Sequence, residues 1–220
     1  MRNNLIIYGL YAYLKYILCM VDKETHLNQL KVYATLGASN HSIKERDLFD
    51  YYATPPSAVE ELLKRETFSE NIIEPSCGEL NISKVLEAHG HQVKNFDILD
   101  RLKDGSIIEQ DFLLENHYYP QSDIITNPPY EKATEFVYHS LNSIDEGQKV
   151  AMLLKLTFLE TKKRKALFLK YPAKKIYVFS YRIECLKNNI QQNKVGSSAV
   201  CYAWYIWEKG YQGPMTIEII

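Results

Sequence analysis

The sequence predicts an α/β fold with a mostly parallel sheet covered by helices on both faces, and three observations lead to this prediction. Apolar runs of strand length alternate with segments that carry apolar residues at helical spacing, from residue 71 to residue 171. Such alternation is typical of parallel sheets, whose crossover helices cover the faces. The last two β-rich stretches, 174–183 and 197–207, have no helix-length segment between them, so we expect them to pair antiparallel.

The individual elements follow from the same patterns. Five apolar runs are expected to form the first strands: 71–75, 92–99, 107–113, 123–127 and 149–156. Three stretches with helical spacing are expected to form helices: 82–90, 130–144 and 160–171. In open parallel sheets, ligands bind beyond the carboxyl ends of the strands. The positions to examine therefore follow Ile73, Phe96, Asp111 and Thr126.

Length and cysteine content restrict the class of protein. A chain of 220 residues is long enough for one domain with a full core. The four cysteines form no CxxC pair, which argues against a zinc site and against a disulfide scaffold. We therefore expect no metal and a reducing compartment.

Residues 1–32 are expected to be an N-terminal extension. The apolar stretch 5–20 is interrupted by Lys15 and is shorter than the roughly 20 residues that a membrane span needs. Cys19 to Val21 offers a poor signal-peptide cleavage site. An extra helix, or a true start at Met20, is expected instead of a membrane segment.

The net charge of −1 hides a strong asymmetry along the chain. Residues 1–148 hold 13 Lys and Arg against 23 Asp and Glu, whereas residues 149–195 hold 12 against 2. A basic segment in a neutral protein is a candidate surface for a nucleic-acid backbone, although a solvated helix face has the same composition. The segment 184–196 is a candidate for nucleic-acid contact or a solvated hairpin loop. The candidate contact residues are Lys162, Lys163, Arg164, Lys187 and Lys194.

Acidic residues stand at three of the expected strand tips. Glu74 ends the first strand, and the following Pro75 and Gly78 predict a tight turn that presents backbone N–H groups to a ligand. Asp97 follows the second strand, 23 positions beyond Glu74, as in folds where an acid accepts hydrogen bonds from a ribose. Asp111 stands at the third tip. Together they predict an adenosine-type ligand, while the absence of GxxxxGK[ST] and GxGxxG disfavours nucleoside triphosphates and NAD.

The stretch Asn127-Pro128-Pro129-Tyr130 follows the fourth strand and predicts a rigid recognition tip. The Asn127 side chain and the Pro128 carbonyl supply two acceptors, which can hold the two hydrogens of an exocyclic amine. Tyr130 offers a ring on which a base can stack, worth about 1–3 kcal/mol. The two prolines keep these groups in place, because a misplacement of about 1 Å can cost about a hundredfold in rate.

Several stretches resemble one enzyme family. "NPPY" after a strand, "EPSCG" upstream, "TLGASNHSIKERDLFDYYATPPSAVEELL", "LLKLTFLETKKRKALF" and "GSSAVCYAWYIWEKGYQG" are similar to the small phage and prophage DNA N6-adenine methyltransferases. The resemblance covers residue 33 to residue 220, which implies a single catalytic domain. It also implies a Rossmann-like sheet of seven strands with an antiparallel last strand, S-adenosylmethionine as cofactor, adenine-containing DNA as partner, and the cytoplasm of a bacterial or phage-infected cell.

The resemblance also implies roles for individual residues. Asn127 to Tyr130 match the catalytic motif that receives a flipped adenine, and the methyl group passes directly to N6. Thr54 and Pro55 match the element that closes over the cofactor, Asp97 the acid that holds the ribose, and Asp111 the acid near the adenine ring of the cofactor. The full cofactor set is Thr54, Pro55, Glu74, Pro75, Gly78, Asp97, Asp111 and Asn127.

Leu80 departs from the family pattern, which has a second glycine at this position of the loop. A side chain here is expected to crowd the cofactor or to require a φ that leucine disfavours, with Asn81 able to absorb the turn. RNA and protein-glutamine methyltransferases share the NPPY motif, so methylation of RNA and methylation of a protein side-chain amide stay open as alternatives. Leu80 leaves open a third alternative, a non-catalytic nucleic-acid-binding relative.

Overall fold

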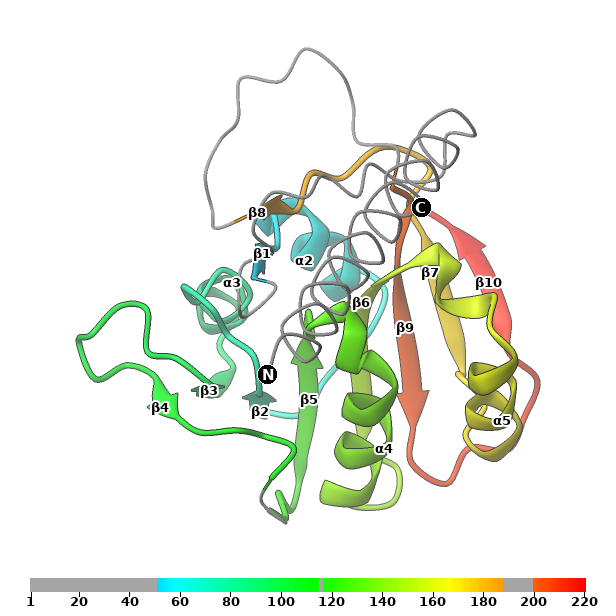
Figure 1. Ribbon diagram of the computed structural model, residues 1–220, viewed down its shortest axis with the longest axis horizontal. Coiled ribbons are helices and arrows are strands. Elements are labelled where there is room, and N and C mark those ends of the chain that lie inside the picture. The colour runs from blue at the N-terminus through cyan, green and yellow to red at the C-terminus, as the bar shows by residue number, and fades with distance from the viewer. Residues whose placement is uncertain (1–50, 115–116, 188–199) are drawn as a thin grey trace, which may run out of the picture. The chain divides into compact units, whose positions relative to one another are not determined.

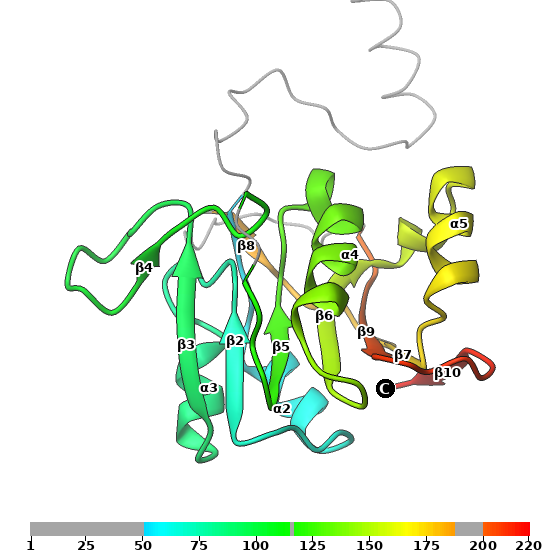
Figure 2. The same cartoon turned by 90° about the horizontal axis from the view of Figure 1, so that it is seen from below.

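An eight-stranded sheet organises the part of the chain that the computed structural model describes, residues 51–114, 117–187 and 200–220 (Figure 1). The expected extension at 1–32 and the start of the expected catalytic domain at 33–50 lie outside these ranges. From one edge to the other, the strands are β10 (Thr216–Ile219), β7 (Lys175–Val178), β9 (Tyr202–Glu208), β6 (Lys149–Lys155), β5 (Ser122–Thr126), β2 (Asn71–Glu74), β3 (Gln92–Asp97) and β4 (Ile108–Glu109). Figure 2 shows this order across the sheet.

Strand directions confirm the predicted fold class. All neighbouring strands in the sheet are parallel except β9, which is antiparallel to both β6 and β7. The antiparallel pairing expected for the two closing β-rich stretches is therefore confirmed by β7 and β9. All seven predicted strands are present, and β9 is the antiparallel last member of that set.

Strand β10 is an eighth strand that the sequence patterns did not indicate. It pairs parallel with β7 at the edge of the sheet, and all four of its side chains are exposed. Its residues, Thr-Ile-Glu-Ile, do alternate polar and apolar side chains, but four residues are the shortest run in which such alternation can mark a strand. The strand β4 was expected over 107–113 but spans two residues, both exposed.

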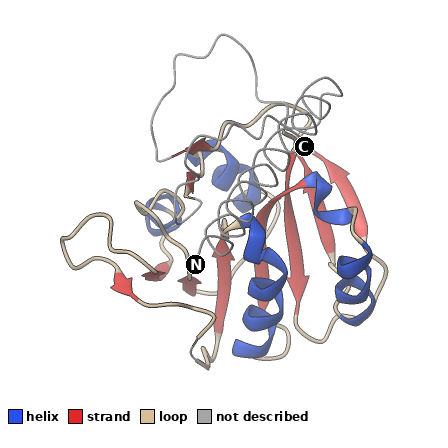
Figure 3. Cartoon of the chain, in the orientation of Figure 1, coloured by secondary structure: helices blue, strands red, loops and turns tan. Residues whose placement is uncertain are grey.

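Helices cover both faces of the sheet, as predicted (Figure 3). The helices α2 (Pro56–Leu63) and α3 (Ser83–Ala88) pack on one face, where Leu62 and Leu86 join the cluster around Ile72 and Ile125. The helices α4 (Ala133–Ser143) and α5 (Lys162–Lys170) pack on the other face. Short 3₁₀ helices, η1 (Tyr130–Lys132) and η2 (Leu156–Leu159), precede α4 and α5. None of the described helices is long and apolar enough to cross a membrane.

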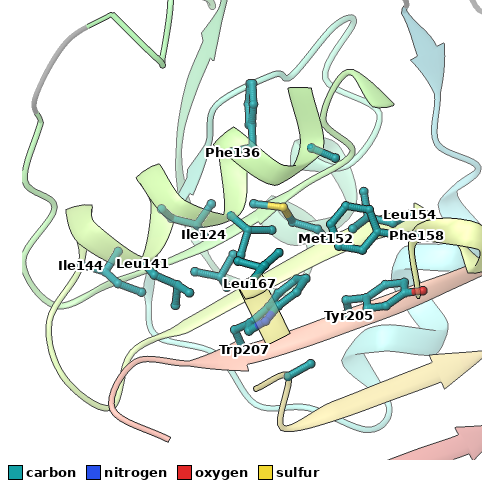
Figure 4. Packing of buried hydrophobic residues seen from close by; sticks show 14 of the residues in the cluster. Ile124, Phe136, Leu141, Ile144, Met152, Leu154, Phe158, Leu167, Tyr205 and Trp207 are labelled. Carbon is teal, nitrogen blue, oxygen red and sulfur yellow. The ribbon is translucent and has the colours of Figure 1, made fainter. Parts of the chain in front are cut away.

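Strand β9 contributes large buried side chains to both faces of the sheet. Trp204 belongs to the α2 face and donates from Nε1 to the Ala58 carbonyl at 2.7 Å. Trp207 belongs to the α5 face and donates from Nε1 to the Tyr171 carbonyl at 3.1 Å. Figure 4 shows Trp207 among the buried side chains of α4, α5 and β6. Because both indole N–H groups are paired, burial of these large rings carries no unsatisfied donor.

The chain reverses its direction of travel across the sheet between β2 and β5. These two strands are neighbours, yet β3 and β4 follow on one side and β6 lies on the other. At such a switch point the loops leave in opposite directions and open a crevice at the carboxyl ends. The described residues also form a separate two-stranded sheet. In it, β1 (Tyr52–Ala53) pairs antiparallel with β8 (Leu186–Lys187), with Tyr52 opposite Lys187.

Candidate active site at the strand tips

A cavity of about 330 Å³ lies at the carboxyl ends of β2, β3 and β5, where the topology predicts a ligand site. Seven of the residues that the sequence singled out line it: Thr54, Glu74, Pro75, Asp97, Asp111, Asn127 and Pro129. Four others do not line it: Pro55, Gly78, Pro128 and Tyr130. A cavity of this size matches the lower range of small-molecule sites.

Glu74 is buried, with 1% of its surface exposed, and it joins a polar chain between three elements. Its Oε2 accepts from the Ser83 backbone N at 3.0 Å and also contacts the Ser83 hydroxyl, which contacts Asn95 Oδ1. One hydroxyl proton cannot serve two acceptors. Burial raises the pKa of Glu74 well above its usual range, so the protonated acid can donate to Ser83, which then donates to Asn95.

Asp97 is held by backbone N–H groups on both carboxylate oxygens. Oδ2 accepts from Gly78 N at 2.8 Å, and Oδ1 accepts from Leu99 N at 3.2 Å. Burial raises the pKa of Asp97, and these two hydrogen bonds oppose that rise because they stabilise the charged form. Each oxygen keeps a further lone pair, so Asp97 can still accept from ligand hydroxyls.

Gly78 shapes the loop without lining the cavity. Its φ is +55°, and a Cβ at this position would overlap the ring of Tyr51. Tyr51 in turn holds the loop: its hydroxyl donates to Asn81 Oδ1 at 3.2 Å and accepts from Glu79 N at 3.3 Å. A side chain at position 78 would therefore strain the turn and displace the tyrosine that holds it.

Leu80 adopts the left-handed backbone conformation that leucine disfavours, as the sequence analysis expected, with φ +64°. The expectation that Asn81 absorbs the turn is wrong, because Asn81 is not among the described residues with positive φ. The Leu80 side chain packs with Cys77 and Ile107 and does not line the cavity. Burial in this small cluster offsets a backbone cost of about 1–2 kcal/mol.

Among the cavity residues that the sequence analysis missed, two carry buried donors without a hydrogen-bond partner. Arg101 and Gln110 both line the cavity, and Arg101 Nε and Gln110 Nε2 are buried donors without a hydrogen-bond partner. Asp111, which follows Gln110, accepts from Leu113 N at 2.9 Å. Unpaired buried donors at a cavity wall are available to a ligand. Their only sequence signal is proximity to the tips after β3 and β4.

Asn127 is the residue with the most asymmetric environment. Its Nδ2 donates to the Tyr52 carbonyl at 3.0 Å and to Thr54 Oγ1 at 3.1 Å. Its Oδ1 is buried and has no hydrogen-bond partner. A buried acceptor left unpaired costs about 1–3 kcal/mol, so this arrangement favours a ligand that brings a donor. The Ser76 hydroxyl fixes the backbone by donating to the Asn127 carbonyl at 3.2 Å.

Tyr130 lies beside the main cavity, next to a second, smaller cavity of about 50 Å³. The Lys155 ammonium sits 4.3 Å from the centroid of its ring, and the Tyr52 ring lies 5.5 Å away, tilted by 35°. Its hydroxyl donates to the hydroxyl of Tyr202 at 3.2 Å. A base that stacks on this ring would have to displace one of these neighbours.

The predicted basic residues lie at the start of α5, as far as the structure describes them. Lys162 and Lys163 are exposed, and Arg164 lies with its guanidinium 4.5 Å from the Phe158 ring centroid. Cations at the positive end of a helix dipole are unfavourable unless an anion binds there. Lys187 is placed by its backbone in β8, and Lys194 lies outside the described residues. Within the described ranges, no group of three metal-ligating side chains occurs.

Comparison with known proteins identifies the fold. No protein-family model and no curated protein matches the chain. A Listeria monocytogenes protein assigned to the class I S-adenosylmethionine-dependent methyltransferases matches with a TM-score of 0.56 and 14% identity, over 84% of this chain and 69% of that one. A Pyrococcus horikoshii protein assigned as an RNA methyltransferase matches with a TM-score of 0.53 and 14% identity, over 83% and 98%.

A third similar structure comes from a restriction system. The modification subunit assigned to a type I restriction enzyme of Vibrio vulnificus matches with a TM-score of 0.55 and 13% identity, over 90% of this chain. This chain spans about half of that subunit, 52%. At these identities the likeness establishes the fold: the chain has the Rossmann-like fold of class I S-adenosylmethionine-dependent methyltransferases.

Proposed function

We propose that this protein transfers a methyl group from S-adenosylmethionine to the exocyclic N6 amine of adenine in DNA. The observation that carries the proposal is the Asn127 amide, whose Oδ1 is a buried acceptor without a partner at the wall of a cavity in a methyltransferase fold. A primary amine brings the donors that such an acceptor lacks. We also propose that it acts in the cytoplasm of a bacterial or phage-infected cell, where it modifies DNA for protection or regulation.

The cavity residues suit the proposed cofactor. Asp97 would accept from the ribose hydroxyls, Asp111 would lie near the adenine ring, and the turn from Glu74 to Gly78 would surround the methionine part. Pro55 and Pro75 would complete this site, while the Thr54 hydroxyl at the cavity wall is engaged by Asn127. The bound cofactor supplies an activated sulfonium methyl group, so the chemistry asks only for positioning of the acceptor amine.

Asn127 and the Pro128 carbonyl would bind the two hydrogens of the target amine. The N6 lone pair of adenine is delocalised into the ring, which makes it a poor nucleophile. Two acceptors draw the nitrogen toward tetrahedral geometry and stabilise the positive charge that develops on it. Because Asn127 Oδ1 is buried, little water competes with the amine for it. Pro129 and Tyr130 would hold the extruded base, with Tyr130 replacing lost stacking once Lys155 moves aside.

The basic segment supports a nucleic-acid substrate. Lys162, Lys163 and Arg164 concentrate positive charge at one end of α5, and Arg164 also lines the small cavity beside Tyr130. Such a cluster favours phosphate contacts, and we propose that Lys187 and Lys194 add to it. RNA is the second candidate substrate, because phosphates alone do not separate it from DNA. Leu80 does not line the cavity, which supports a catalytic protein over a non-catalytic relative.

The test uses purified protein, radiolabelled S-adenosylmethionine and, in parallel, unmethylated DNA, RNA and a protein substrate, followed by nucleoside and amino-acid analysis. We expect N6-methyladenine in DNA from the wild type. Asn127→Ala should lower the rate by at least about a hundredfold while cofactor affinity, measured by calorimetry, stays within about twofold. Asn71→Ala, an exposed asparagine at the start of β2, is the matched control and should keep full activity.

Three outcomes would change the assignment. Label in RNA or in a protein amide would correct the substrate and keep the site. Full activity of Asn127→Ala would refute the site. Cofactor binding without transfer to any substrate would refute the enzyme hypothesis.

A further inference from the structure

We propose that Thr54 is a positioning residue that, together with the Tyr52 carbonyl, fixes which end of the Asn127 amide is left for the substrate. The Tyr52 carbonyl and the Thr54 hydroxyl both accept from Asn127 Nδ2, at 3.0 and 3.1 Å. This pair of acceptors, here called the amide lock, leaves Oδ1 as the only unpaired end of the side chain. The kinetic consequences of the lock rest on the proposed function, but the lock itself is testable without it.

The Tyr52 carbonyl determines the orientation. A hydroxyl can donate or accept, so Thr54 alone would tolerate either end of the amide. A backbone carbonyl only accepts, so a flipped amide would set Asn127 Oδ1 against the Tyr52 oxygen and lose the hydrogen bond to it. The orientation therefore follows from the chemistry of the neighbours.

Both acceptors of the amide lock lie in the segment 52–54, here called the strap. Tyr52 and Ala53 form β1, whose ladder partner is β8, with Tyr52 opposite Lys187. Thr54 is 3% exposed, and α2 begins two residues later, with Ala58 N donating to the Pro55 carbonyl at 3.0 Å. The strap is thus fixed by a ladder on one side and by a helix start on the other. Both acceptors are separated from Asn127 by more than 70 residues in sequence.

The lock matters because the target amine has only donors to offer in the reacting geometry. With Nδ2 held by the strap, Asn127 presents Oδ1, and the amine hydrogens find an acceptor. With the amide released, Nδ2 can turn toward the amine, and two NH₂ groups then oppose each other. Loss of the lock should therefore lower kcat, whereas the affinity for the cofactor should not change.

A direct contact of Thr54 with the cofactor makes the opposite prediction, which separates the two roles. Thr54→Val keeps the shape and removes the acceptor, and Thr54→Ser keeps the acceptor. We expect Thr54→Val to lower kcat by about tenfold, the effect of one lost hydrogen bond, with the dissociation constant of S-adenosylmethionine within about twofold of wild type. Thr54→Ser should recover most of kcat. A raised dissociation constant with unchanged kcat would overturn the proposal.

A second variant leaves Thr54 in place in case Thr54→Val does not fold. Asn127→Asp keeps the shape but carries only acceptors when ionised, so its carboxylate would oppose the Tyr52 carbonyl. We expect a loss in kcat of more than about a hundredfold at neutral pH, with partial recovery at lower pH as the new acid gains a proton that it can donate to Tyr52. Activity near the wild-type level at neutral pH would show that the lock does not select the orientation.

Hydrogen exchange of the Asn127 side-chain amide tests the lock without any activity. In the ¹⁵N spectrum of wild type, the resonance lost in Asn127→Ala should exchange slowly, and Thr54→Ser should keep that protection. Thr54→Val should exchange faster. Equal exchange in Thr54→Val and wild type would overturn the lock. A protected amide in a protein that methylates no substrate would refute the proposed function and leave the lock standing.

Discussion

The loop after β2 and the tip after β5 differ in whether their buried polar groups have hydrogen-bond partners. In the first region, Glu74 and Asp97 are tied by hydrogen bonds to Ser83, Gly78 and the neighbouring backbone. In the second region, Asn127 has its nitrogen tied and its oxygen buried without a partner. Both regions line one cavity, so the contrast lies between two parts of a single site.

This contrast separates binding from reaction. The loop after β2 is complete before any ligand arrives, which suits a site that holds one cofactor in one pose. The tip after β5 keeps a buried acceptor whose cost, about 1–3 kcal/mol, is recovered only when a donor arrives. Such local destabilisation is typical of groups that act on a substrate, since the rest of the fold must hold them in place.

The largest expected effect comes from breaking the loop after β2 at Gly78. In Gly78→Ala, the positive φ costs about 1–2 kcal/mol, and the overlap with the Tyr51 ring adds about 1–3 kcal/mol of overpacking. Because Gly78 N also binds Asp97, we expect the affinity for S-adenosylmethionine to fall by about tenfold or more. Urea unfolding and calorimetry measure the two effects.

Gly90→Ala is the matched control for this substitution. Gly90 also has a positive φ, +91°, but nothing lies within 4 Å of the position that its Cβ would occupy. It should lose stability through backbone strain alone and keep its cofactor affinity. If the two variants bound the cofactor equally well, Gly78 would have no special part in the site.

The convergence of the candidate site was predictable because it depends on topology alone. Glu74 and Asp97 end a parallel strand, Asp111 and Asn127 closely follow one, and parallel strands place their carboxyl ends at one edge of the sheet. Periodicity sufficed to find those strands because buried parallel strands are continuous apolar runs, as in β5, where Ile124 and Ile125 are fully buried.

The rest of the site depends on contacts between residues far apart in sequence. The ladder between Tyr52 and Lys187 is two residues long and has no periodicity to detect. The amide lock needs Thr54 beside Asn127, and the polar chain needs Ser83 beside Glu74, and neither pairing leaves a local pattern. Leu80 could be recognised as a misfit, but its packing with Ile107, which is distant in sequence, leaves no local pattern.

A pH series on Glu74→Gln tests whether the loop after β2 is complete because Glu74 carries a proton. The ordinary pKa of a glutamate is about 4.3, and burial raises the pKa of Glu74 well above its usual range. Between these two values the folded state binds more protons than the unfolded state, so stability falls as pH rises, by up to about 1.4 kcal/mol per pH unit.

The amide of Glu74→Gln does not titrate, and its NH₂ can donate to Ser83 as the protonated acid does. The free energy of unfolding of the variant should therefore fall less steeply with pH than that of the wild type, so the variant should become the more stable of the two as pH rises. Urea unfolding of both proteins from pH 5 to pH 9 isolates the contribution of Glu74 as a difference. Parallel curves would mean that Glu74 is ionised in the folded protein and that Ser83 donates to it.

Substitutions of Leu80 should have the smallest effect on the site. They test whether backbone strain in the loop after β2 affects the stability of the fold without affecting the affinity for the cofactor. Leu80→Gly removes about 1–2 kcal/mol of backbone strain but loses about 1.5–3 kcal/mol of burial and about 0.5–1 kcal/mol of chain entropy, so we expect a net loss of about 1 kcal/mol. Leu80→Ala loses burial and keeps the strain, so it should be less stable than Leu80→Gly although alanine is larger. Neither variant should change the affinity for S-adenosylmethionine by more than about twofold, because Leu80 packs on Cys77 and Ile107 outside the cavity. The reverse order of stabilities would refute the strain, and a tenfold gain in affinity for Leu80→Gly would mean that the leucine does obstruct the cofactor.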